Sequence, residues 1–196
     1  MNFLAHAYLS FHHPSLLVGN MISDFVKGKK QFDYSIAIQK GIQLHRAIDT
    51  FTDEHEATKQ AKLFLKPVVG LYAGAFIDIV YDHFLAIDTH QFKSDKELAV
   101  FAANTYNVLD NHLSVLPIPF QEMLPHMKQQ NWLYNYQFIW GIEKSFAGLV
   151  RRANYLQTHQ PALEAFQINY KALKESYDLF FPDVLTFAQS LAQQLK

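Results

Sequence analysis

The scarcity of chain-breaking residues between long segments of helical period most constrains the fold. Only seven Gly and seven Pro occur in the 196 residues. Apolar residues recur every three or four positions, whereas the alternating pattern of strands is scarce. The pattern predicts an all-α chain. No repeat, low-complexity tract or linker interrupts it, so we expect residues 1–196 to form a single-domain multi-helix bundle, long enough for a sizeable core.

Breaker residues and caps set the expected helix boundaries. Ser94 and Glu97 have the spacing of a capping box, and Pro161 and Pro182 are typical of helix starts. No apolar run reaches the roughly 20 residues that span a bilayer, and the first residues lack the features of a signal peptide, so we expect a cytoplasmic protein without a membrane anchor. The expected helices cover residues 2–11, 15–26, 35–53, 55–65, 68–87, 94–113, 120–130, a segment ending near 151–152, 162–180 and 182–195.

Composition narrows the function classes. Lys and Arg number 17 against 18 acidic residues, a net charge of −1, which argues against a dedicated nucleic-acid binder. Cysteine is absent, which excludes disulfides, cysteine–zinc sites and thiol nucleophiles. Any metal ligands must come from the ten histidines and the carboxylates, which favours Mn, Mg, Fe or Zn.

The segment Gly41–Asp53 places several ionisable side chains on a helix that must pack. His45, Asp49 and Asp53 lie one turn apart on the same face, and Arg46 lies one position round from His45. Burying such groups without partners is costly. A metal ion with a bound phosphate would offset the cost of burying these side chains, and so would a salt-bridge network. This segment alone favours neither.

Three further polar interruptions of apolar segments add to this pattern. Asp78 and Asp82 lie one turn apart beside His83 in the run FIDIVYDHFL, Asp24 ends a mainly apolar helix, and His6 lies in the apolar first segment. Each residue alone is more often structural. Together, three helices that each bring a carboxylate into apolar surroundings, two of them with His as well, have the composition of a His/Asp metal site.

Basic residues form two small groups, and motifs of other chemistries are absent. Lys27, Lys29 and Lys30 read as a solvated turn that could also meet an anionic substrate or an acidic protein, and Arg151–Arg152 is a weaker patch of the same kind. The sequence contains no Gly-rich phosphate loop, G-x-S-x-G elbow or H-E-x-x-H zinc motif.

Four linked motifs in the first 85 residues resemble the acyl carrier protein phosphodiesterase family. They are NFLAH, G-N-x-x-x-D-F-V-x-G at Gly19–Gly28, H-R-x-I-D-x-x-T-D at His45–Asp53, and D-x-x-x-D-H-F-L at Asp78–Leu85. The resemblance implies an all-α fold related to HD phosphohydrolases, although the doublet here is Asp82-His83 rather than His-Asp. It also implies hydrolysis of holo-acyl carrier protein to the apo carrier and 4′-phosphopantetheine, with manganese as the usual activator and Mg, Fe or Co as alternatives.

These observations predict a metal-dependent phosphodiesterase. Arg46 would clamp the phosphate, His6 would bind metal, orient a ligand or protonate the leaving group, and Asp53 would either bind metal or cap the next helix. Two alternatives stay open: a related phosphohydrolase of nucleotides or other small phosphodiesters, and a non-catalytic helical module that binds an acidic carrier protein. The expected metal ligands are Asp24, His45, Asp49, Asp78, Asp82 and His83, and the expected carrier-binding residues are Lys27, Lys29 and Lys30.

Overall fold

The computed structural model describes residues 1–195 and contains only helices in that range, which confirms the predicted fold class. Short 3-10 helices occur at η1 (Ser23–Phe25), η2 (Gly28–Asp33), η3 (Gly70–Tyr72) and η4 (Leu113–Val115). The α-helices are α1 (Phe3–Tyr8), α2 (Pro14–Ile22), α3 (Ile36–Glu54), α4 (Glu56–Val69), α5 (Ala73–Ala86), α6 (Asp95–Asn111), α7 (Ile118–Gln129), α8 (Trp132–Asn135), α9 (Ile139–Val150), α10 (Gln160–Ile168) and α11 (Tyr170–Gln194).

Two proline residues lie inside helices that were expected to break there. α4 continues through Pro67 to Val69, and α11 continues through Pro182. A proline removes one backbone hydrogen bond, but α11 buries apolar side chains on both sides of Pro182, which favours continuation. The break falls instead at Asn169, whose side-chain amide donates to the Ala165 carbonyl at the end of α10. The predicted helix ends before Pro67 and Pro182 are therefore wrong.

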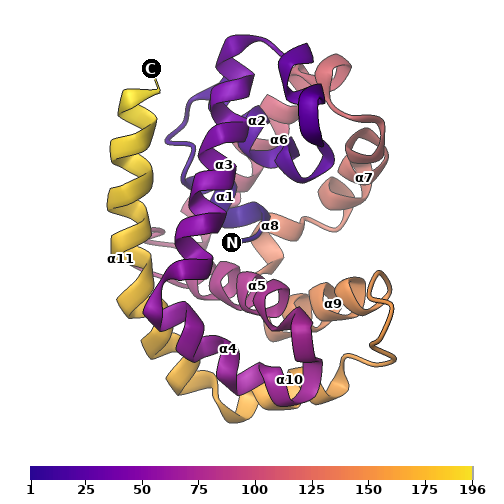
Figure 1. Cartoon of the computed structure of the whole chain (residues 1–196), viewed down its shortest axis with the longest axis vertical. Helices are drawn as coiled ribbons and strands as arrows, with labels where there is room; N and C mark the ends of the chain where they lie inside the picture. The colour runs from indigo at the N-terminus through magenta and orange to yellow at the C-terminus, as the bar shows by residue number, and fades with distance from the viewer. Residues whose placement is uncertain (196) are drawn as a thin grey trace.

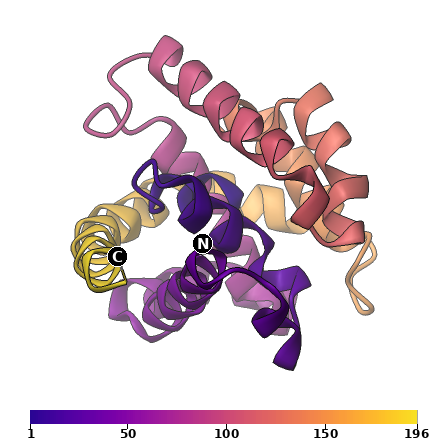
Figure 2. The same ribbon diagram turned by 90° about the horizontal axis from the view of Figure 1, so that it is seen from above.

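The helices surround a short central one (Figures 1 and 2). α1 packs against α2 and α5, while α11, the long yellow helix at one edge of Figure 1, packs against α3, α4 and α5. α6 crosses the other side of the molecule in Figure 2 and contacts α2. Buried side chains from every α-helix belong to one hydrophobic cluster. This arrangement places the first residues of the chain in the interior.

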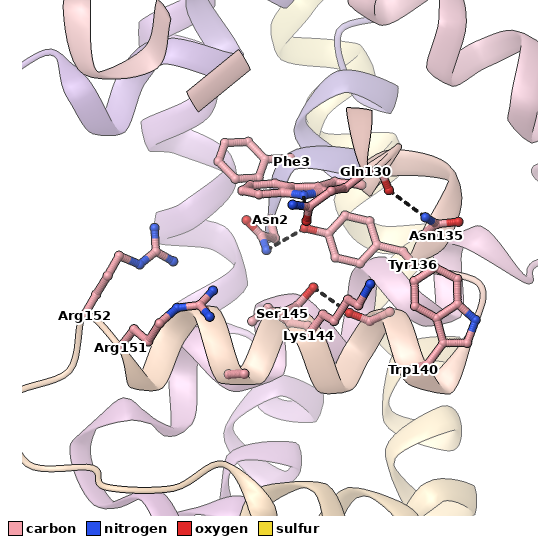
Figure 3. A pocket seen from close by; sticks show the side chains of 15 residues that line it. Asn2, Phe3, Gln130, Asn135, Tyr136, Trp140, Lys144, Ser145, Arg151 and Arg152 are labelled. Carbon is pink, nitrogen blue, oxygen red and sulfur yellow. Dashed lines mark hydrogen bonds between the residues drawn. The ribbon is translucent and has the colours of Figure 1, made fainter. Parts of the chain in front are cut away.

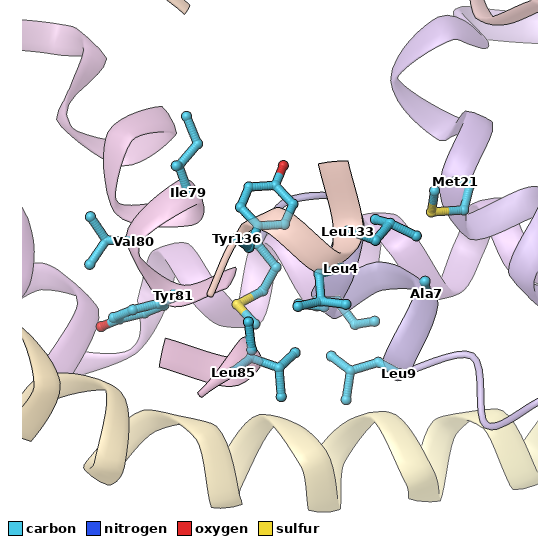
Figure 4. Packing of buried hydrophobic residues seen from close by; sticks show 14 of the residues in the cluster. Leu4, Ala7, Leu9, Met21, Ile79, Val80, Tyr81, Leu85, Leu133 and Tyr136 are labelled. Carbon is cyan, nitrogen blue, oxygen red and sulfur yellow. The ribbon is translucent and has the colours of Figure 1, made fainter. Parts of the chain in front are cut away.

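The position of α1 is set by burial, because a helix of six residues has little stability of its own. Leu4 and Ala5 are fully buried, and Figure 4 shows Leu4 between Leu85 of α5 and Leu133 of α8. α5 also supplies Asp82, whose carboxylate accepts hydrogen bonds from backbone N–H groups at the start of α1. Met1 and His6 are thereby held in the interior.

Glycines let α2 and α3 approach backbone to backbone. A Cβ atom on Gly19 would lie 2.1 Å from the Ile38 carbonyl oxygen, and one on Gly41 would lie 2.4 Å from the Leu16 carbonyl oxygen. Any larger residue would force the helices apart. This contact places Asn20, the residue after Gly19, against α3. On α3, Gly41 lies one helical turn before His45.

The stretch Glu56–Ala86 is long and apolar enough to cross a membrane by length and composition, although Asp78 and Asp82 interrupt its apolar residues. Core helices pass the same test. Here Gly70, with a φ of 57°, separates α4 from α5. Buried side chains of both helices belong to the hydrophobic cluster.

Candidate metal centre

Three side chains from α1 and α3 converge beside the first residue of the chain. The rings of His6 and His45 stack, with centroids 3.9 Å apart and 15° between their planes. Asp49 Oδ1 lies 3.2 Å from His6 Nε2, and its Oδ2 lies 3.0 Å from His45 Nε2. One potential ligand atom from each residue lies within 4.8 Å of the others, close enough to share one ion. We call these three residues the His–Asp cluster.

Asn20 orients both histidine rings of the cluster. Its side-chain oxygen lies 2.7 Å from His6 Nδ1, and its backbone oxygen lies 2.7 Å from His45 Nδ1. The Asn20 amide nitrogen donates to the His6 carbonyl and to Ser10 Oγ, which makes the side-chain oxygen the acceptor. Both rings therefore donate from Nδ1 and direct Nε2 toward Asp49, as metal-ligating histidines do.

Electrostatics in the cluster are dominated by burial and by the shared carboxylate. Burial and the adjacent His45 lower the pKa of His6 to about 4. Burial also acts to lower the pKa of His45, but hydrogen bonds to Asp24 and Asp49 outweigh it and raise the pKa to about 9. Burial acts to raise the pKa of Asp49, but its interactions with His45 and His6 outweigh burial and lower the pKa. Without a metal, one proton on His45 holds the cluster together near neutral pH.

Asp24 and Asp78 lie at the edge of the cluster. Asp24 Oδ1 in η1 is 3.2 Å from His45 Nε2, and this hydrogen bond lowers the Asp24 pKa. The Asp24 side chain is 74% exposed, so it could also contact a ligand. Asp78 of α5 lies on the other side, where its Oδ1 is 2.7 Å from the Met1 amine. The same amine is 3.7 Å from Asp49 Oδ1, so it bridges the two carboxylates.

Asp82 and His83 have other partners. Asp82 is fully buried and accepts from the backbone N–H groups of Asn2, Leu4 and Ala5, at 3.2, 2.7 and 3.2 Å. Burial raises its pKa to about 7, although these N–H groups and the nearby amine act to lower it. His83 Nδ1 lies 2.7 Å from the Tyr136 carbonyl oxygen, and its Nε2 lies 2.9 Å from the Tyr170 hydroxyl. The structure does not bring either residue into the His–Asp cluster.

Arg46 and the lysines lie outside the cluster. Arg46 Nη1 donates to Gln31 Oε1 at 2.7 Å, and its Nη2 donates to the Val26 carbonyl at 3.1 Å. Arg46 therefore ties α3 to the segment that carries the three exposed lysines Lys27, Lys29 and Lys30.

Asp53, on the same face of α3 as His45, also has a partner elsewhere. It pairs with Lys62 at 2.7 Å. The N-cap of α4 is His55, whose ring accepts from the Ala57 N–H. The prediction that Asp53 caps the next helix is therefore wrong.

The donor set suits a divalent cation. With Nδ1 of each ring committed to Asn20, a neutral His6 directs its Nε2 lone pair toward Asp49 Oδ1 and the Met1 carbonyl oxygen, each 3.2 Å away. A positive charge is needed where these electron-rich atoms meet. Imidazole nitrogens with carboxylate oxygens suit Mn, Fe or Zn. Fold and site together define an all-α protein with a candidate His/Asp metal centre.

Comparison with known proteins names the family. A family model described as acyl carrier protein phosphodiesterase matches residues 1–184. Curated relatives of that name occur in Photorhabdus laumondii, 30% identical over 97% of this chain and 96% of the relative, and in Yersinia enterocolitica, 29% identical over 96% and 98%. No solved structure matches. The chain belongs to the acyl carrier protein phosphodiesterase family, which confirms the resemblance and identifies it as a phosphoric diester hydrolase.

Two parts of the site were not predicted from the sequence. Asn20 is fully buried and contacts both histidines, and the motif G-N at Gly19–Asn20 was the available signal. A buried amide after a helix-contact glycine can hold the rings of metal-ligating histidines in one orientation. The Met1 amine, which lies between Asp49 and Asp78, leaves no mark in a pattern of side chains.

Proposed function

We propose that this protein hydrolyses holo-acyl carrier protein to the apo carrier and 4′-phosphopantetheine. The proposal includes a divalent cation held by His6, His45 and Asp49, with Asp24 and Asp78 at the edge of this cluster. One observation carries it: Asn20 fixes both rings so that two Nε2 atoms face one carboxylate. The family name supplies the substrate class.

The cation, when bound, would lower the pKa of a water molecule and offset charge on the phosphoryl oxygens. The residues of the chain supply the rest. Asn20 holds the ring orientations, and Asp49 joins the two histidines. His6, with its pKa near 4, is neutral at pH 7, so it offers a lone pair and is poorly suited to protonate a leaving group. Attack of water on phosphorus would break the bond to the carrier serine oxygen, which leaves with a proton.

Manganese is the expected ion, with Mg, Fe or Co as alternatives. We infer that the acidic carrier docks at Lys27, Lys29 and Lys30, which are exposed in a segment held by Arg46. A direct phosphate clamp by Arg46 would require its guanidinium to leave Gln31 and Val26. We further propose that the chain is one domain and acts in the cytoplasm, where no disulfide chemistry is needed.

The test combines metal analysis with mass spectrometry of the carrier. Purified protein should retain about one ion or more per chain after desalting, and holo-carrier should lose the mass of phosphopantetheine. His45→Gln should abolish both, because it removes one imidazole ligand. His90→Gln is the matched control, because His90 is exposed and lies outside the cluster. Full turnover by His45→Gln with unchanged metal content would exclude this site.

A further inference from the structure

A pocket of about 610 Å³ lies beside α9 (Figure 3). Its aromatic part is formed by Phe3, Trp132, Tyr136 and Trp140, and Asn2, Gln130 and Asn135 add side-chain amides. The volume is within the range of small-molecule sites. Neither the predicted site nor the His–Asp cluster includes these residues.

The charge of the pocket lining is entirely of one sign. Lys144, Arg151 and Arg152 line it, and no aspartate or glutamate does. In the described part of the chain these three side chains form no ion pair; Lys144 Nζ lies 4.9 Å from the centre of the Trp140 ring. Guanidinium groups bind phosphate in a bidentate manner. The pocket therefore suits a ligand that combines an anionic group with an apolar body.

The pocket adjoins the His–Asp cluster. Asn2 follows Met1, whose amine contacts Asp78, and Ile79 follows Asp78; both Asn2 and Ile79 line the pocket. The Asn2 side-chain amide donates to the Tyr136 hydroxyl at 2.9 Å, and Figure 3 shows this pair between Phe3 and Ser145. A ligand in the pocket would reach the residues next to the candidate metal centre.

We infer that this pocket binds the phosphopantetheine group, as the arm of the substrate and as the released product. The inference rests on the proposed function and extends it to a specific subsite. 4′-Phosphopantetheine has two amides and a dimethyl carbon, which match the amide and aromatic lining. Its phosphate gains negative charge when hydrolysis converts the diester into a monoester. The unpaired cations therefore favour binding of the released product.

The test measures binding to metal-free protein in a chelator, so that the His–Asp cluster cannot hold the phosphate through a cation. Isothermal titration should detect 4′-phosphopantetheine, and pantetheine without phosphate should bind at least about tenfold more weakly. The double variant R151Q/R152Q should remove that difference, whereas Trp140→Ala should weaken both ligands. The matched control K93Q/K96Q carries the same charge change at exposed lysines of another region and should bind like the wild type.

Three results would overturn the inference. One is equal binding of 4′-phosphopantetheine to wild type and R151Q/R152Q, and another is tighter binding of adenosine monophosphate than of phosphopantetheine. The third is an equal loss of affinity for the apo carrier in R151Q/R152Q, because the arginines would then contact the carrier rather than the arm. Turnover of holo-carrier by the wild type is measured separately. Its absence contradicts the proposed function, whereas turnover with unchanged product inhibition in R151Q/R152Q contradicts only this subsite.

Discussion

Two segments with closely related sequence patterns have different surroundings in this fold. In α3, His45 and Asp49 lie one turn apart, and in α5, Asp78 and Asp82 lie one turn apart beside His83. Both segments place His and Asp among apolar residues. His45 and Asp49 meet His6 at a partly exposed edge, where Asp49 is 40% exposed. Asp82 and His83 are buried with protein partners.

The difference lies in the partners of each polar atom. Asp82 accepts from three backbone N–H groups of the first residues, so it serves as the cap that α1 lacks locally. His83 has a protein partner on each ring nitrogen. In the α3 segment only Nδ1 of His45 has a backbone partner, and Nε2 faces carboxylates. A buried His or Asp is a candidate metal ligand only when one of its nitrogen or oxygen atoms remains available to bind the metal.

The largest expected effect is on catalysis by the α3 segment. Asp49→Asn should lower kcat/KM for holo-carrier by about 10³-fold, because loss of a metal ligand costs several kcal/mol of transition-state stabilisation. Circular dichroism should show unchanged helicity. Asp53→Asn, one turn further along α3 and paired with Lys62, is the matched control and should keep nearly full activity. Equal losses in the two variants would mean that position on α3, and not ligation, decides activity.

The second effect is on the stability of the α5 segment. Asp82→Ala would leave three backbone N–H groups without an acceptor and should lower the free energy of unfolding by about 3 kcal/mol or more. Asp82→Asn keeps one acceptor oxygen and should lose roughly half as much. Urea unfolding measures both. If Asp82 is a metal ligand, Asp82→Asn will instead lose bound metal while its metal-free stability stays near the wild-type value.

The sequence was sufficient for the fold class and for several of the residues that the fold brings together. Helical period and scarce breakers predicted an all-α chain, because they act locally. The motifs assigned His45, Asp49 and Asp24 to one site, and these three residues lie together in the fold. The contacts of Asp82 with α1 and of Asn20 with His45 join residues far apart in the chain, and helical periodicity does not identify the partner of either residue. For the same reason Pro182 was read as a helix start, although packing of α11 on the core continues the helix.

The smallest expected effect is a pH dependence that separates the two segments. The pKa of His45 is raised to about 9 from 6.5. Its stabilisation of the metal-free protein is therefore fully present below pH 6.5 and lost as the pH rises through 9. A cation must displace this proton, so manganese affinity should increase about tenfold per pH unit up to about pH 9.

Calorimetry in buffers of different ionisation enthalpy should count one proton released per ion. The Met1 amine, whose pKa is also raised by Asp78 and Asp49 against its burial, adds a slope of the same sign to metal-free stability. The His45→Gln variant keeps that slope, so its difference from the wild type isolates His45. His83, whose pKa burial lowers, is neutral in the folded and unfolded chains at pH values well above 6.5, so His83→Gln should retain the wild-type dependence in that range. Loss of the proton release in His83→Gln would show that the metal centre includes α5 and contradict its assignment to the His–Asp cluster.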